Sequence, residues 1–94
     1  MFALANLQID HLEHFLDVFG SDGVDRREAL GSLGTQVFTA TDDDSQVYVL
    51  LEWRDRESFE AFAQGPETAA NLERGGVTQP PAFVLLDAAA RFDA

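Results

Sequence analysis

A phenol and a carboxylate stand on the same side of one apolar stretch of this sequence. In VYVLLEW (47–53), Tyr48 and Glu52 are four positions apart, and an extended chain turns both side chains to one face. A carboxylate held among apolar walls keeps its proton more tightly and can work as a general acid or base. We therefore predict Tyr48 and Glu52 as catalytic groups that handle protons. The alternative is structural: Glu52 pairs with Arg27 or Arg54, and Tyr48 reaches water.

Three further side chains complete the predicted site. Asn6 and Gln8 share one side of the run FALANLQI (2–9), which we expect to pair with the stretch that carries Tyr48. Phe38 belongs to a third predicted strand, and its ring is large enough to contact a ligand. We predict that Asn6, Gln8 and Phe38 line a small apolar pocket and bind its ligand. Packing without a ligand is the alternative role for Phe38.

Two histidines raise the question of a metal site. His11 and His14 are one helical turn apart and stand among three acidic residues, which are Asp10, Glu13 and Asp17. Structural zinc normally needs four protein ligands and catalytic zinc three, and these are the only histidines in the chain. Acidic residues at a helix start also have a capping role. We expect no metal here.

Other cofactor signatures are weak. The aspartate run 42–44 lacks the alternating pattern, central glycine and distant glutamate of a calcium loop, so a solvated hairpin turn at 42–45 is the better prediction. GSLG (31–34) and ERGG (73–76) lack the phosphate-loop pattern. The chain has no cysteine, which excludes disulfides, thiolate metal sites and a cysteine nucleophile. No cofactor is predicted.

The charge balance limits the kinds of partner that the protein can bind. Seventeen acidic residues face six basic ones, all of them arginine, and the net charge is -11. Such a surface repels phosphate backbones and anionic lipid, so we expect neither nucleic acid nor a membrane as partner. Carboxylates keep a surface hydrated in concentrated salt, where their repulsion is screened, and this favours a salt-loving source. An ordinary acidic protein from a genome that prefers arginine is the alternative.

Length and composition predict one domain, residues 1–94, in the cytoplasm. The chain is 46% hydrophobic with eight phenylalanines, which excludes disorder. The first ten residues have no basic leader, and their apolar run is too short for a signal peptide or a membrane span. A domain of this size buries only about 60 to 65% of its unfolded surface. Association with a second copy would add to its buried surface.

Periodicity predicts the order β-α-β-β-α-β of an α+β, ferredoxin-like fold. The strands are expected at 2–9, 35–41, 46–53 and 82–87, and the main helices at 12–19 and 56–64, with shorter helical pieces at 24–30 and 67–74. Asp55 is the predicted N-cap of the helix at 56–64, and a turn is expected at GSDG (20–23). Helices on one face of a four-stranded antiparallel sheet leave the other face bare.

Both faces of this sheet are apolar, which predicts a homodimer joined through the bare face. Large apolar residues alternate onto each side of every strand; examples are Phe38 against Val37, and Leu50 against Val49. A contiguous apolar patch of that size is a liability in a monomer. Pairing of two sheets removes it.

Four segments carry a resemblance to a known family. They are IDHLEHF (9–15), RREALGSLGTQVF (26–38), VYVLLEWRDRESFEAFAQGPE (47–67) and GGVTQPPAFVLL (75–86). With them the chain resembles the dimeric α/β-barrel proteins of the antibiotic biosynthesis monooxygenase-like group over nearly its whole length. The resemblance implies homodimers whose two sheets face each other around a pocket, and relatives that include oxygenases, isomerases and ligand-binding proteins.

The resemblance transfers no catalytic residue. Where similar small proteins tend to have a histidine in the first strand and a tryptophan in the first helix, this chain has Leu7 and Phe15. The leading hypothesis is a cofactor-independent monooxygenase-like enzyme that acts on a small aromatic or quinol-like compound, in a small apolar pocket between sheet and helices. The alternatives are a non-catalytic small-molecule binder or sensor, and a structural dimer whose sheet faces fill each other.

Overall fold

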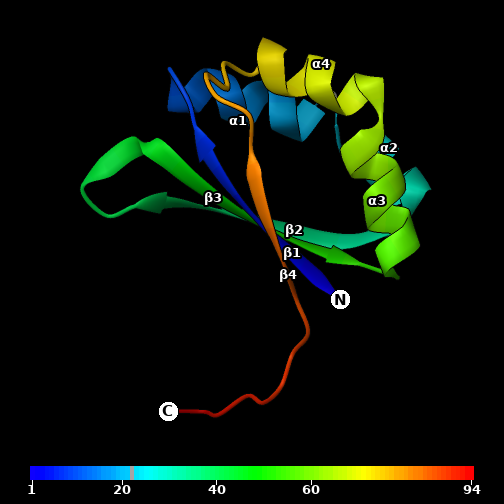
Figure 1. Ribbon diagram of the computed structural model, residues 1–94. Coiled ribbons are helices and arrows are strands. Elements are labelled where there is room, and N and C mark those ends of the chain that lie inside the picture. The colour runs from blue at the N-terminus through cyan, green and yellow to red at the C-terminus, as the bar shows by residue number, and fades with distance from the viewer. Residues whose placement is uncertain (22) are drawn as a thin grey trace.

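Four strands form one antiparallel sheet in the order β2-β3-β1-β4 in the computed structural model, which describes residues 1–21 and 23–94. The elements are β1 (Phe2–Gln8), α1 (Leu12–Ser21), α2 (Val24–Leu30), β2 (Ser32–Ala40), β3 (Asp43–Trp53), α3 (Arg56–Gln64), α4 (Pro66–Arg74) and β4 (Ala82–Leu86). The helices gather on one side of the sheet, and the tail after β4 leaves the body (Figure 1). The predicted α+β, ferredoxin-like fold is confirmed.

The core is formed by alternate residues of the two central strands, which point toward the helices. β1 pairs with β3 so that Ala5 lies opposite Val49 and Leu7 opposite Val47. These residues turn to the helices and are at most 3% exposed. Trp53 at the end of β3 is fully buried, and its ring packs against Phe59 and Phe62 of α3. The small side chains of β1 therefore allow large rings from the helices to sit close to the sheet.

Three predicted boundaries need correction. β2 begins at Ser32 rather than at residue 35. β3 begins at Asp43, and Ala40 pairs with Asp43, so the hairpin turn is Thr41–Asp42 rather than 42–45. Ser45 donates its backbone N–H and its hydroxyl to the Asp43 carboxylate, which keeps this polar segment extended. α1 continues to Ser21, inside the turn predicted at 20–23. Residue 22 of that predicted turn lies outside the described residues.

The N-terminus of α3 is capped as predicted. Asp55 has extended backbone angles, and its carboxylate accepts a hydrogen bond of 2.7 Å from the Ser58 N–H. This hydrogen bond lowers the pKa of Asp55. A carboxylate with a lowered pKa stabilises the fold above its unfolded value, and that contribution is lost as the pH falls through the folded value.

We expect Asp55→Ala to lower the thermal unfolding temperature at pH 7, because the Ser58 N–H loses its acceptor. The difference from the parent should shrink below about pH 4, where an unfolded aspartate protonates. Asp55→Asn is the matched control, since an asparagine caps a helix without a titrating group. Thermal melts of the three proteins between pH 2 and pH 7 test this. A deficit in Asp55→Ala that stays constant down to pH 2 would contradict it.

The second face of the sheet is not covered by any helix. We call it the open face; its residues are Phe2, Leu4, Asn6, Gln8, Gln36, Phe38, Gln46, Tyr48, Leu50, Glu52, Val84 and Leu86. None of them is buried, and Phe38, Leu86 and Val84 are 43%, 39% and 55% exposed. The open face thus combines an apolar centre with polar groups at its ends.

Candidate functional site

All five residues predicted from the sequence lie on the open face. Tyr48 stands in one cross-strand row with Asn6 of β1 and Phe38 of β2, its direct partners in the sheet. Glu52 lies in another row, opposite Phe2. Tyr48 and Glu52 are four positions apart on β3, which is roughly 13 Å along the strand. A small substrate therefore cannot receive a proton from one and give a proton to the other at a single atom.

The two amides belong to a polar network at the hairpin end of this face. The Asn6 Oδ1 accepts a hydrogen bond from the Gln46 Nε2. Gln8 donates from Nε2 to the Ser45 hydroxyl at 3.1 Å, and that hydroxyl donates to Asp43 at 2.6 Å. The hydrogen bonds of Ser45 lower the pKa of Asp43. Asn6 and Gln8 thus hold the hairpin to β1, and no hydrogen bond joins them to Tyr48.

The alternative partners predicted for Glu52 are occupied elsewhere. Arg27 donates to the backbone carbonyl of Phe19, and Arg54 contacts Asp55 and Ser58. Over residues 1–21 and 23–94, the Glu52 carboxylate has neither a hydrogen bond nor an ion pair. The predicted pairing of Glu52 with Arg27 or Arg54 is therefore wrong.

The predicted position of the pocket also needs correction. The predicted pocket lies between sheet and helices and is lined by Asn6, Gln8, Phe38, Tyr48 and Glu52. These side chains lie on the face away from the helices, because successive residues of a strand point to opposite sides. The space between sheet and helices is lined by a different set of residues.

No metal site is assembled in the described parts of the chain. No group of three or more metal-ligating side chains comes together within residues 1–21 and 23–94. The His14 ring nitrogen Nε2 pairs with the carbonyl oxygen of Arg74 at 2.6 Å. His14 thereby links α1 to the end of α4.

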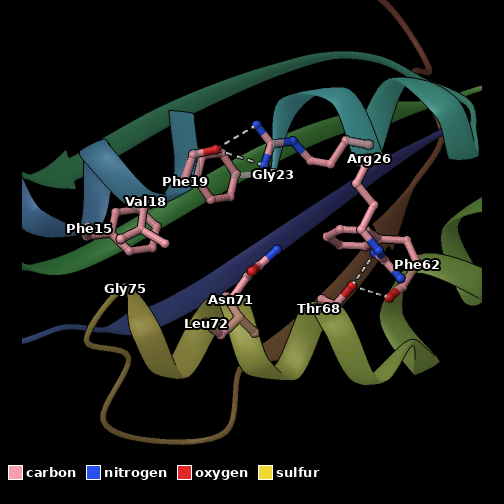
Figure 2. Close-up of a pocket in the computed structure, with 11 residues that line it drawn as sticks. Phe15, Val18, Phe19, Gly23, Arg26, Phe62, Thr68, Asn71, Leu72 and Gly75 are labelled. Atoms are coloured by element: carbon pink, nitrogen blue, oxygen red, sulfur yellow. Dashed lines mark hydrogen bonds between the residues drawn. The ribbon is translucent and has the colours of Figure 1, made fainter. Parts of the chain in front are cut away.

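A cavity of about 30 Å³ lies between α1, α2, α3 and α4, and we call it the helix pocket (Figure 2). Its lining is mostly aromatic and aliphatic, with three polar side chains and one buried arginine; the residues are Phe15, Val18, Phe19, Gly23, Arg26, Arg27, Phe62, Thr68, Asn71, Leu72 and Gly75. Apolar walls with a few polar groups are typical of small-molecule sites. As it stands, the cavity has room for water and not for an aromatic ring.

Arg26 closes the helix pocket toward solvent. Its Nε donates to the Glu67 carboxylate at 2.8 Å, its Nη1 to the Thr68 hydroxyl at 2.7 Å, and its guanidinium carbon lies 5.8 Å from the centre of the Phe62 ring. On the outer side, Arg26 and Asn71 also line an open hollow of about 440 Å³. The Glu67 side chain is 74% exposed, so this ion pair is of the weak surface type. Displacement of Arg26 would join cavity and hollow, and it would break the hydrogen bond to Thr68 as well as this ion pair.

Sequence reasoning missed the polar groups of the helix pocket. Arg26 was not singled out, and Thr68 and Asn71 were read only as part of a helix. A signal was present, since Arg26 and Arg27 are adjacent in a chain with only six basic residues. Their meeting with α4 depends on contacts across more than forty residues, such as Arg26 with Thr68. Local periodicity carries no information about contacts of that range.

The topology and the covered face define a small ferredoxin-like α+β protein with one sheet face open. The model of the antibiotic biosynthesis monooxygenase family matches residues 2–74. The chain belongs to this family, and the resemblance predicted from its sequence is confirmed. Among curated proteins, none matches the sequence significantly. No helix within residues 1–21 and 23–94 is long and apolar enough to cross a membrane.

Solved structures share the fold at low sequence identity. An antibiotic biosynthesis monooxygenase is 17% identical with a TM-score of 0.72, over 95% of this chain and 98% of that chain. SnoaB, a cofactor-independent oxygenase from Streptomyces nogalater, is 16% identical with a TM-score of 0.70, over 99% and 96% of the two chains. A monooxygenase from the gene ActVA-Orf6 of Streptomyces coelicolor, solved with the ligand nanaomycin D, is 18% identical with a TM-score of 0.66, over 99% and 91%. At these identities the likeness shows the fold alone.

Proposed function

We propose that the protein works as a homodimer joined through the open face. The exposed surface of the chain is 6197 Å², whereas a globular monomer of this mass exposes about 5,400 Å². Part of the excess is the extended tail, and part is the apolar open face. A standard interface buries about 800 Å² on each partner, and the exposed apolar side chains of the open face are available for such an interface. A cytoplasmic location and a salt-loving source stay predictions.

The helix pocket is the proposed substrate site. The observation that supports it is the combination of aromatic walls with the guanidinium of Arg26 and the amide of Asn71 at the side that borders the outer hollow. A flat aromatic compound with one ionised oxygen matches this arrangement, with its ring among Phe15, Phe19 and Phe62 and its oxygen toward Arg26. Entry requires Arg26 to leave Glu67.

The proposed reaction is oxygenation of a quinol-like compound without a cofactor. An ionised phenol is electron-rich and can itself supply the electrons that dioxygen needs. At a methylene carbon conjugated to that ring, one oxygen atom of O₂ forms the new carbonyl, and the other oxygen leaves as water with both hydrogens. Arg26 would favour the ionised form of the substrate, and the apolar walls would exclude bulk water.

Non-catalytic binding is the second candidate function. The lining of the helix pocket contains no carboxylate, imidazole or phenol among the described residues, and so no side chain that ordinarily accepts a proton. A substrate must then ionise before it enters. A binder or sensor needs no such group and predicts a ligand that is recovered unchanged.

The catalytic role predicted for Tyr48 and Glu52 is a competing proposal about the place of the chemistry. It requires the substrate to lie between two paired sheets, on the side opposite the helix pocket. The Glu52 carboxylate would then face Phe2 of its own chain and the partner's sheet. A structural dimer whose sheets fill that space completely would leave no room for such a substrate.

Two isosteric variants distinguish the helix pocket from the open face as the place of the reaction. We expect Asn71→Leu to weaken substrate binding at least tenfold, because the amide at the pocket mouth is lost. Glu52→Gln should leave binding and turnover within twofold. Oxygen consumption with a panel of anthrone-type compounds, and mass spectra of the recovered compound, measure both effects. If Glu52→Gln loses turnover while Asn71→Leu keeps normal binding and turnover, the reaction takes place at the open face. Binding without oxygen uptake would support the sensor.

A further inference from the structure

Arg27 is a buried cation held by a backbone carbonyl. The residue is 6% exposed, and its guanidinium carbon lies 3.9 Å from the centre of the Phe19 ring. Its Nη1 and Nη2 each donate a hydrogen bond of 3.1 Å to the Phe19 carbonyl oxygen. Gly23 makes this placement possible, because a Cβ at that position would collide with Nη1.

No carboxylate pairs with Arg27 in the part of the chain that the structure describes. The arginines with ion pairs over residues 1–21 and 23–94 are Arg26, Arg54 and Arg56. Buried charges are normally paired; burial lowers the pKa of Arg27, and the charge of the neighbouring Glu28 carboxylate opposes that shift. The Phe19 carbonyl belongs to the last turn of α1, whose dipole supplies about half an opposite charge. A guanidinium carries five N–H donors, so these two hydrogen bonds leave donors for a further acceptor.

Arg27 also lines an open groove. It has a volume of about 600 Å³ and lies between α1, α2 and the edge strand β2. Its apolar lining comes from Leu16, Phe19, Val24, Leu33 and Val37, and Leu16 and Leu33 are 43% and 64% exposed. A volume of this size is in the range of small-molecule sites. The groove therefore has mostly apolar walls, and Arg27 and Glu28 are the charged residues among its described lining.

We propose that this groove binds a small organic monocarboxylate with an apolar body, and that Arg27 is the group that recognises the carboxylate. A planar guanidinium matches a carboxylate in a two-pronged hydrogen-bonded pair. The net charge of -11 disfavours anions over most of the surface. Glu28 also lines the groove, and its carboxylate repels every anionic group there, so the ligand can carry no more than the one carboxylate that Arg27 offsets. The ligand is thus a monoanion.

This site goes beyond the proposed function. Arg27 also lines the helix pocket, but the groove opens between α1, α2 and β2 and does not include Thr68, Asn71 or Leu72 of α4. Asn71→Leu, which should weaken the helix pocket, is therefore expected to leave the groove unchanged. The two proposals can fail independently.

Octanoate is the probe, and 1-octanol is its uncharged match. In an NMR titration of the ¹⁵N-labelled protein, we expect the Arg27 Nε–Hε signal to shift saturably with octanoate, at least tenfold more tightly than with 1-octanol. Asn71→Leu should give the same octanoate curve. Equal responses to the two compounds, or no response at Arg27, would overturn the proposal.

A variant at the rim removes the risk of disturbing the fold. Leu33 is exposed at an irregularity of β2, so Leu33→Glu should fold normally while placing a second negative charge in the groove. We expect Leu33→Glu to weaken octanoate binding at least tenfold and Leu33→Gln to weaken it less than threefold. Similar losses in both variants would show that the carboxylate is not recognised by charge.

Discussion

Phe38→Asp is expected to turn the protein from a dimer into a monomer. Phe38 is 43% exposed in the single chain and lies on the edge strand β2, on the open face beside Tyr48. A two-fold interface uses the same patch on both subunits, so each dimer would receive two carboxylates where two phenylalanine rings were buried. A buried, unpaired carboxylate costs several kcal/mol. Two of them should weaken association more than a thousandfold, since each 1.4 kcal/mol is tenfold.

Leu16→Asp is the matched control for this experiment. Leu16 is also 43% exposed, but it lies on α1, on the helical side of the molecule. In an isolated chain the two substitutions replace equally exposed side chains, so only an interface on the open face can separate them. We expect Leu16→Asp to remain a dimer. Light scattering on a sizing column measures the mass of each protein.

The same column tests the role of salt. With a net charge of -11 on each subunit, association in low salt brings two strongly acidic bodies together. We expect the parent dimer to weaken in low salt and to hold in molar salt, while Phe38→Asp stays monomeric in both. A parent protein that is monomeric in both buffers would refute the dimer. Dimers of Phe38→Asp would place the interface on another surface.

The fold was predictable because its information is local. The alternation of Val47, Val49 and Leu51 along one strand and the Asp55 cap of α3 each need only a few neighbouring residues. The open face was predictable for the same reason, since strand alternation also determines which residues lie there. The ends of β3 and α1 were not, because the Asp43–Ser45 hydrogen bonds extend a strand into a segment whose composition favours a turn.

The candidate site was only partly predictable. The five polar and aromatic candidates share a face, as expected, but that face is not the one beneath the helices. The predicted pocket combined residues of the open face with the space on the opposite face, between the sheet and the helices. The helix pocket depends on where Arg26 of α2 meets Thr68 of α4, and on a buried Arg27 whose partner is a carbonyl rather than an acid. Pairings of this kind cannot be read from residue types, because any backbone carbonyl can serve as acceptor.

The largest stability effect inside the helix pocket is expected from Phe15→Ala. Phe15 is 1% exposed, stacks on Phe19 with 5.4 Å between ring centres, and lines the pocket. Removing a buried phenylalanine ring costs about 3 to 5 kcal/mol, which is a large part of the roughly 5 to 15 kcal/mol that stabilises a domain. Urea unfolding at one fixed protein concentration measures the loss. A loss below about 1 kcal/mol would mean that α1 does not pack on the sheet as described.

Phe59→Ala is the control that distinguishes an effect on the helix pocket from a general effect on the core. Phe59 is 5% exposed and packs against Trp53 and Phe83, but it does not line the helix pocket. Both truncations should destabilise the protein comparably. Only in Phe15→Ala does the new void merge with the existing cavity of about 30 Å³, so benzene should restore more stability there, because a ligand stabilises the state that binds it. Equal recovery in the two variants would show that the cavity at Phe15 has no special capacity for an aromatic ring, and the substrate site proposed for the helix pocket would lose its physical basis.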